Sequence, residues 1–208
     1  MIQPQDITGM VLAGGRGSRM GGIDKGLQPF QGTPLAQHVL QRMQPQVGAC
    51  MINANRNLDT YASFGVPVHA DTLADYAGPL AGFVSGLMHG TSPWLLTVPC
   101  DSPRLPMDLA QRMAHTAHQH GADIVLAAAP EAGRDGTLQL RAQPVFALLH
   151  TRLLGSLQDF IQGGGRKIDS WTAQHTQALC AFDLPSDDVY AFANANTLQE
   201  LHALEAKA

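Results

Sequence analysis

The residues best suited to chemistry form a glycine-rich stretch near the N-terminus, with a lysine close behind it. The stretch is Leu12-Ala13-Gly14-Gly15-Arg16-Gly17-Ser18-Arg19-Met20-Gly21-Gly22, and Lys25 follows. Glycines let backbone N–H groups approach a phosphate, and arginines supply forked donors that match phosphate oxygens. A flexible surface turn is the ordinary meaning of clustered glycines, but it does not explain the basic residues placed directly after an apolar segment. The stretch therefore predicts a phosphate-binding loop, with Arg19 and Lys25 as catalytic cations.

This loop differs from the two commonest phosphate-binding motifs. A dinucleotide-binding fingerprint that starts at Gly15 and Gly17 would need a glycine where Met20 stands. A Walker A loop ends in Gly-Lys-Ser or Gly-Lys-Thr, whereas Lys25 precedes Gly26. Both differences argue against a dehydrogenase and against a P-loop nucleoside triphosphatase.

Two aspartates follow apolar segments further along the chain. Asp101 comes directly after such a segment and precedes Ser102 and Pro103. This position suits a magnesium ligand, because magnesium takes one or two carboxylates together with phosphates and water. An aspartate in a turn or at a helix N-cap fits equally well, so both interpretations stay open. Asp71 is either a carboxylate that accepts hydrogen bonds from a base or ribose, or a turn residue.

Three further features have ordinary explanations of at least equal weight. Residues 78–82 enter a predicted helix whose first amides would face a substrate, but a plain helix start is simpler. Histidines at 115, 118 and 120 have no cysteine or carboxylate at ligand spacing, which favours a solvated helix face. The basic glycine cluster 163–167 suits either a second anionic substrate or a surface loop.

Apolar runs alternate with segments of helical periodicity over the first 130 residues. Strands are expected at 7–13, 47–54, 65–70, 94–98 and 122–129, and helices from Pro34, from Pro79 and over 106–120. Residues 139–150 predict one or two strands interrupted at Pro144, followed by a helix near 153–160 and a closing helix at 199–206. This alternation is typical of an α/β fold whose mostly parallel sheet is covered on both faces.

The candidate functional residues all lie where the predicted strands end. The glycine-rich loop follows the first strand, Asn53 and Asn55 lie near the end of the second, and Asp71 and Asp101 follow the third and fourth. Sheets of this kind bind ligands at the carboxyl ends of their strands. We therefore expect these residues to meet in one site.

Composition narrows the classes of function. At 208 residues the chain suits a single domain spanning 1–208. The net charge of −4 argues against nucleic-acid binding through a general basic face. Cys50, Cys100 and Cys180 form no CxxC pair and are expected to be small buried residues in a reducing compartment. The chain has neither a signal-peptide pattern nor an apolar run of about 18 residues, so we expect a cytoplasmic protein without a membrane partner.

Taken together, these segments resemble the bacterial molybdenum cofactor guanylyltransferases, the family of molybdopterin-guanine dinucleotide biosynthesis protein A. Each shared motif is weak alone, but their order and spacing through most of the chain are specific. The motifs are Leu12-Ala13-Gly14-Gly15, Arg19-Met20-Gly21-Gly22, Asp24-Lys25-Gly26, Asn53-Ala54-Asn55-Arg56, Asp71, Gly78-Pro79-Leu80-Ala81-Gly82, Pro99-Cys100-Asp101-Ser102-Pro103, Gln143-Pro144 and Asn194-Ala195-Asn196-Thr197. The resemblance implies a three-layer, doubly wound, mostly parallel sheet with one antiparallel strand, as in nucleotide-sugar transferases.

The resemblance also implies a reaction: magnesium-bound GTP and molybdopterin, in its molybdenum-bound form, give the guanine dinucleotide cofactor and pyrophosphate. It assigns GTP binding to Leu12, Ala13, Gly14, Gly15, Lys25, Asn53, Asp71 and Asp101. Asp101 is also expected to bind Mg²⁺. It places Gly78, Gly82, Asn194 and Asn196 on the pterin side. Proteins that insert molybdenum or accept the finished cofactor are further expected partners.

Two of the three alternatives share the loop, lysine and aspartate. A cytidylyltransferase acting on the same pterin and a sugar-phosphate nucleotidyltransferase would both use them. Guanylyl transfer is favoured by Gly14-Gly15, where alanine-glycine is expected in most such proteins, together with Asn53 and Asp71. A carrier that binds GTP or the cofactor without chemistry belongs to another class and would not need Asp101.

Overall fold

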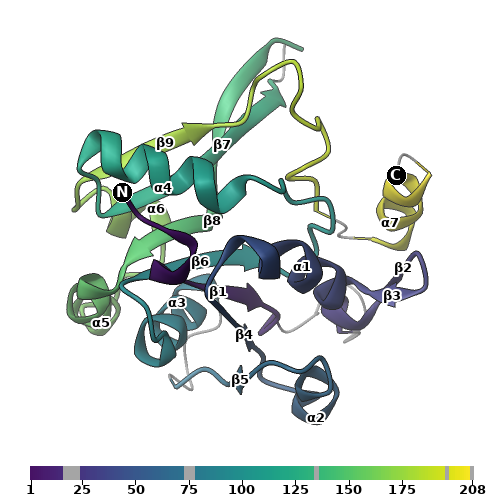
Figure 1. The fold of residues 1–208 in the computed structure, drawn as a ribbon, viewed down its shortest axis with the longest axis horizontal. Helices are drawn as coiled ribbons and strands as arrows, with labels where there is room; N and C mark the ends of the chain where they lie inside the picture. Colours follow the sequence, from purple (N-terminus) through teal and green to yellow (C-terminus); the bar gives the residue numbers. More distant parts are fainter. Residues whose placement is uncertain (16–23, 73–77, 134–135, 195–196, 207–208) are drawn as a thin grey trace.

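A seven-stranded sheet forms the middle layer of the structure, with strand order β5-β4-β1-β6-β8-β7-β9 (Figure 1). This computed structural model describes residues 1–15, 24–72, 78–133, 136–194 and 197–206. The strands are β1 (Ile7–Leu12), β4 (Ala49–Asn53), β5 (Val68–His69), β6 (Trp94–Pro99), β7 (Ile124–Ala132), β8 (Leu138–His150) and β9 (Gln177–Ala181). Neighbouring strands are parallel except at β8, which runs antiparallel to β6 and β7. The expected mostly parallel sheet with one antiparallel strand is confirmed.

Helices cover both faces of the sheet and complete the three layers. One face carries α1 (Leu35–Met43), α2 (Leu58–Ala62) and α4 (Leu109–His120), and the other carries α3 (Pro79–His89), α5 (Leu154–Gln162) and α6 (Ile168–Thr172). Successive side chains of a strand point to opposite faces. Val11 therefore lies in one core with Val39 of α1, whereas Met10 lies in the other core with Phe83 of α3. No helix among the described residues is long and apolar enough to cross a bilayer.

The winding of the chain reverses at β1. From β1 the chain passes through α1 to β4 and then to β5, all on one side of β1. It then returns through α3 to β6, which pairs with β1 on its other side. The carboxyl ends of β1, β4 and β6 consequently meet at one edge of the sheet, beside the reversal, where open α/β sheets bind ligands.

The sequence patterns do not predict α2, α6 or β9, each of which has five residues. In β9 only Cys180 is fully buried, so its hydrophobic signal is weak. The helix expected from 106 begins at Leu109, and the closing helix α7 spans Leu198–Glu205. The short strands β2 (Pro29–Phe30) and β3 (Thr33–Pro34) form a hairpin beside α7, and Phe30 packs there with Leu201 (Figure 1). Short 3-10 helices lie at Pro4–Asp6, Lys25–Leu27, Gln44–Gln46 and Thr151–Leu153.

The expected interruption at Pro144 is a change of pairing within one strand. β8 continues unbroken through Pro144. However, its register against β7 jumps between Ala147 and Gln143, so that 144–146 are skipped in the pairing. Proline has no N–H to donate and is tolerated in a sheet where the ladder is irregular. The irregularity therefore lies where proline is least costly.

Candidate functional site

A cleft of about 330 Å³ opens at the carboxyl ends of the central strands. This volume is in the range of small-molecule binding sites. Ten residues predicted from the sequence line it: Leu12, Ala13, Gly14, Gly15, Lys25, Asn53, Asp71, Gly78, Asp101 and Asn194. Five others complete the lining: Asp24, Pro79, Pro99, Cys100 and Val145. The expected meeting of the strand-end residues in one site is confirmed.

One wall of the cleft carries an ion pair between Lys25 and Asp101. Lys25 Nζ lies 2.8 Å from Asp101 Oδ2, and the two side chains are 24% and 13% exposed. Lys25 begins a 3-10 turn, and Asp101 follows β6, so the fold joins residues 76 positions apart. A lysine and a carboxylate on one cleft wall offer a cation to phosphate oxygens and an anion to a divalent metal.

A second wall holds Asp71 between two asparagine amides. Asn53 ends β4 and is 2% exposed, and its Nδ2 donates to Asp71 Oδ1 at 2.9 Å and to the His69 carbonyl at 3.1 Å. Asn55 Nδ2 donates to Asp71 Oδ2 at 2.7 Å, and the Asp71 N–H donates back to Asn55 Oδ1 at 2.8 Å. Each carboxylate oxygen still has a lone pair to offer, because it can accept two hydrogen bonds. Asp71 is therefore an oriented acceptor.

The end of β1 runs closely past these amides. The Ala13 N–H donates to the Asn53 carbonyl at 2.8 Å, and Asn55 Nδ2 donates to the Gly14 carbonyl at 3.2 Å. A Cβ at Gly14 would lie 2.9 Å from Asn55 Nδ2 and 3.0 Å from Asn53 Oδ1. These contacts are too short for a side chain. Glycine is required here because the backbone itself lies against the asparagines.

The residues that the resemblance assigns to the pterin take different positions. Gly78 and Asn194 line the cleft, and Asn194 Oδ1 accepts a hydrogen bond from the buried Ser102 hydroxyl at 2.7 Å. Gly82 is buried within α3, where a Cβ would lie 2.4 Å from Leu12 Cδ2. Gly82 therefore supports the cleft from behind. A contact between Gly82 and the pterin stays a prediction.

Part of the predicted site lies outside the described residues. This holds for Arg19 and the rest of 16–23, for 73–77 and for Asn196. The roles predicted for Arg19 and Asn196 stay predictions. The described part of the glycine-rich stretch, residues 12–15, lines the cleft.

One residue of the cleft, Asp24, and one beside it, Asn55, have roles that the sequence did not reveal. The sequence predicts that Asn55 lies near a strand end, but the resemblance assigns only Asn53 to the nucleotide. Residues two apart in extended chain share a face, so the Asn-Ala-Asn spacing is the signal that points to Asn55 as well. In the sequence Asp24 is only part of the Asp24-Lys25-Gly26 motif, and its burial at 9% exposure comes from contacts with distant residues.

The cysteine beside Asp101 is unsuited to be a nucleophile. Burial raises the pKa of the Cys100 thiol far above its usual range, and Asp101 raises it further. Burial also raises the pKa of Cys50 to about 11. All three cysteines are free, and the expectation of small buried residues is confirmed for Cys100 and Cys180, whereas Cys50 is half-buried.

The donors of the cleft suit a divalent metal that binds together with phosphates. Within the described part of the chain, no three His, Cys, Asp or Glu side chains could enclose an ion. Asp101 uses Oδ2 for Lys25, and this ion pair leaves Oδ1 unused. Magnesium is commonly held by one or two carboxylates plus phosphates and water. Asp101 fits that pattern.

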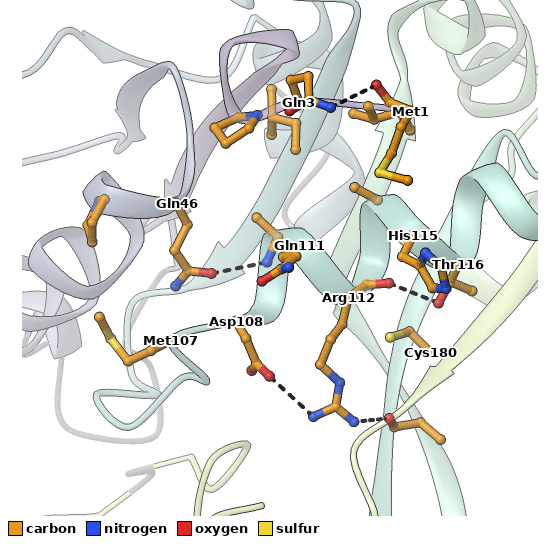
Figure 2. A pocket seen from close by; sticks show the side chains of 17 residues that line it. Met1, Gln3, Gln46, Met107, Asp108, Gln111, Arg112, His115, Thr116 and Cys180 are labelled. Carbon is orange, nitrogen blue, oxygen red and sulfur yellow. Dashed lines mark hydrogen bonds and ion pairs between the residues drawn. The ribbon is translucent and has the colours of Figure 1, made fainter.

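A larger hollow of about 810 Å³ lies between the N-terminal residues, α4 and β9 (Figure 2). Its polar groups join α4 to neighbouring segments. Arg112 of α4 pairs with Asp187 at 2.7 Å and Asp108 at 3.6 Å, and Gln46 Oε1 accepts the Ala110 N–H at 3.0 Å. The hollow contains none of the residues predicted to bind the nucleotide. We therefore place the chemistry in the smaller cleft.

The basic glycine cluster 163–167 ends α5 and does not line the cleft. Gly164 has a φ of 90°, and the Gly165 N–H donates to the Phe160 carbonyl at 2.9 Å. The Arg166 guanidinium donates to the Ile161 carbonyl. This arrangement is that of a helix C-terminus, which favours the surface-loop interpretation. The three histidines of α4 are exposed, as predicted.

Comparison with known proteins relates the chain to one family. Residues 9–179 match the MobA-like NTP transferase domain. The chain is 68% identical over 206 residues to the molybdenum cofactor guanylyltransferase of Acidovorax ebreus, covering 99% of this chain and 98% of that protein. It is 53% identical over 207 residues to that of Cupriavidus necator, covering 100% of both.

Solved structures share the fold at low identity. Molybdopterin-guanine dinucleotide biosynthesis protein A from Archaeoglobus fulgidus superposes with a TM-score of 0.74 at 19% identity, covering 96% of this chain and 97% of that one. A putative glucose-1-phosphate thymidylyltransferase from Bacillus anthracis gives 0.71 at 14% identity, covering 97% and 95%. These likenesses confirm the three-layer fold.

Proposed function

Because this chain belongs to the molybdenum cofactor guanylyltransferases, within the MobA-like NTP transferase family, we propose that it transfers GMP from GTP to the terminal phosphate of molybdopterin. A pterin phosphate oxygen bonds to the α-phosphorus of GTP, and the bond from that phosphorus to the bridging oxygen breaks. Pyrophosphate leaves, and molybdopterin guanine dinucleotide, in its molybdenum-bound form, is the product. Proteins that insert molybdenum or accept the product are the proposed partners.

The observation that carries this proposal is the pairing of Lys25 with Asp101 at the ends of the central strands. The 2.8 Å pair places a cation and an anion beside the start of the glycine-rich stretch. Lys25 exchanges Asp101 for phosphate oxygens when the nucleotide binds. Its charge then stabilises the negative charge that grows on the leaving pyrophosphate.

Asp101 is the residue that would hold the divalent metal, which we take to be magnesium. The ion, when bound, neutralises charge on the triphosphate and helps to align it. Asp71 and Asp24 are less suited, since protein donors engage both oxygens of each carboxylate. One protein carboxylate with phosphate oxygens is a normal magnesium environment.

The reaction needs no protein nucleophile. A terminal phosphate is already ionised, so the protein has to bring two anions together in line. The raised pKa of the Cys100 thiol keeps this neighbouring group protonated at neutral pH. The residues of the cleft therefore bind, orient and neutralise charge.

Selection of guanine rests on the wall formed by Asn53, Asn55 and Asp71. The two amides fix the direction of the Asp71 carboxylate, which can then accept N–H groups from a base whose edge presents donors to it. A base that lacks those donors leaves the carboxylate without that partner. The wall thus favours guanine over the pyrimidines.

The proposal is tested with molybdopterin, Mg²⁺ and each of GTP, ATP, CTP and UTP in separate reactions. We expect pyrophosphate release and dinucleotide formation to be fastest with GTP. Faster release with CTP would identify a cytidylyltransferase instead. Replacing molybdopterin with glucose 1-phosphate tests the sugar-phosphate alternative, for which we expect no pyrophosphate.

A further inference from the structure

Asp24 is a buried carboxylate in the cleft that the proposed chemistry does not use. It is 9% exposed and directly precedes Lys25 in the sequence. A buried charge is costly unless partners compensate for the lost water. The identity of those partners therefore indicates what Asp24 does.

Protein groups surround both oxygens of this carboxylate. Oδ1 accepts hydrogen bonds from the Tyr61 hydroxyl at 2.7 Å and from the Gly26 N–H at 3.2 Å. Oδ2 accepts one from Asn57 Nδ2 at 2.9 Å and lies 3.6 Å from Arg56 Nε. A carboxylate offers about four acceptor positions. Hydrogen bonds fill three of these positions and Arg56 lies beside the carboxylate, so Asp24 is already held by the protein and is less suited than Asp101 to be a ligand.

The same contacts clamp the turn that carries Lys25. Asp24 caps the 3-10 helix Lys25–Leu27 through the Gly26 N–H. Gly26 is buried, and a Cβ there would lie 2.4 Å from the Tyr61 hydroxyl of α2. Tyr61 is itself 0% exposed. The residues on both sides of Lys25 are therefore held against a buried part of the core.

We propose that Asp24 is a positioning residue, which holds the Lys25 backbone so that Nζ reaches the triphosphate beside Asp101. This rests on the function proposed above. The lysine stem is flexible, so the position of its ammonium depends on how firmly its backbone is held. A displacement of about 1 Å at a reacting site can cost on the order of 100-fold in rate.

Two substitutions test the proposal. Asp24→Asn keeps the size of the side chain but removes its charge and one acceptor, and Tyr61→Phe removes only the hydroxyl donor. Asp24→Asn should lower kcat/KM for GTP by about 10- to 100-fold, with a raised KM and a raised Kd for GTP in Mg²⁺. Tyr61→Phe should act in the same direction with a smaller effect. Pyrophosphate release gives kcat and KM, and calorimetry gives Kd.

A double-mutant cycle separates positioning from a general loss of stability. If Asp24 acts through Lys25, Asp24→Asn should add no further change to the Kd or KM for GTP in the Lys25→Ala background. Asp187→Asn is the matched control, because it breaks the 2.7 Å ion pair with Arg112 outside the cleft. It should lower the unfolding temperature and leave the KM for GTP unchanged.

The proposal would be overturned if Asp24→Asn and Tyr61→Phe both kept the wild-type Kd and KM for GTP. It would also be overturned if Asp24→Asn changed these constants by the same factor in the Lys25→Ala background as in the wild type. If Asp24→Asn does not fold, Tyr61→Phe completes the same cycle. A wild-type protein that binds GTP but releases no pyrophosphate with molybdopterin would refute the proposed function alone. The Kd measurements would still decide the role of Asp24.

Discussion

Lys25 and Asp101 neutralise each other on the cleft wall at 2.8 Å. Asp101→Ala should abolish pyrophosphate release, because the metal loses its only proposed protein carboxylate. GTP binding without metal should remain measurable, since Lys25 no longer has to leave Asp101 to reach the phosphates. Calorimetry in EDTA measures GTP binding without metal, and a pyrophosphate assay with Mg²⁺ measures turnover. Asp183→Ala, at an exposed position, is the control. Normal dinucleotide formation by Asp101→Ala would contradict the metal role of this residue.

Packing between helix α3 and the sheet supports the cleft at the scale of elements. A Cβ at Gly82 would lie 2.4 Å from Leu12 Cδ2 and 2.9 Å from Asn53 Oδ1. Gly82→Ala should therefore lower the free energy of unfolding by about 1–3 kcal/mol and weaken GTP binding by displacing Asn53. Urea unfolding and calorimetry measure the two effects. Gly155→Ala on α5 is the control, because a Cβ there meets nothing within 4 Å. It should lower neither the free energy of unfolding nor the affinity for GTP, and a loss equal to that of Gly82→Ala would exclude the packing explanation.

The contact between β5 and α3 introduces a dependence on pH. His69 and His89 stack with ring centroids 3.9 Å apart and planes 8° from parallel. Burial, and secondly the neighbouring His89, lower the pKa of His69. Between this lowered pKa and the ordinary value of about 6.5, the unfolded chain binds more protons than the folded one. The free energy of unfolding therefore falls as the pH drops through about 6.5, until His69 is protonated in the folded chain too.

His69→Phe should remove this part of the acid sensitivity, because the ring stack is kept and the titrating group is lost. Urea unfolding at several pH values between about 7.5 and 5 should show a shallower loss of stability than in the wild type. His118→Phe, at an exposed position on α4, is the control and should keep the wild-type slope. An unchanged slope in His69→Phe would show that the pair does not contribute.

At the scale of the whole molecule, we expect residues 1–208 to unfold as one domain, because both cores are built on the same strands. The two tryptophans report on opposite faces: Trp94 packs against the core of α1 and α4, and Trp171 lies within that of α3 and α5. Single-tryptophan variants, Trp171→Phe and Trp94→Phe, should show coincident fluorescence transitions in urea. Two separate midpoints would indicate that the faces unfold independently.

Much of this protein is determined by its sequence alone. Alternating apolar and helix-periodic segments predict the layered sheet, and the motif residues predict which strand ends carry chemistry. Carboxyl ends of parallel strands meet at one edge, so Gly14, Asn53, Asp71 and Asp101 had to converge once the strands were known. Local sequence patterns predict these strands and helices because the spacing of apolar residues follows which side chains are buried.

Only the tertiary structure decided how these residues contact one another. Three sets of contacts join segments far apart in the chain. They are the ion pair of Lys25 with Asp101, the hydrogen bonds from Asn53 and Asn55 to Asp71, and the hydrogen bond from Tyr61 to the buried Asp24. Strand β9 likewise depends on its neighbour β7, because five weakly apolar residues have no preference strong enough to define it. Such contacts follow from which elements become neighbours, and no local pattern encodes that.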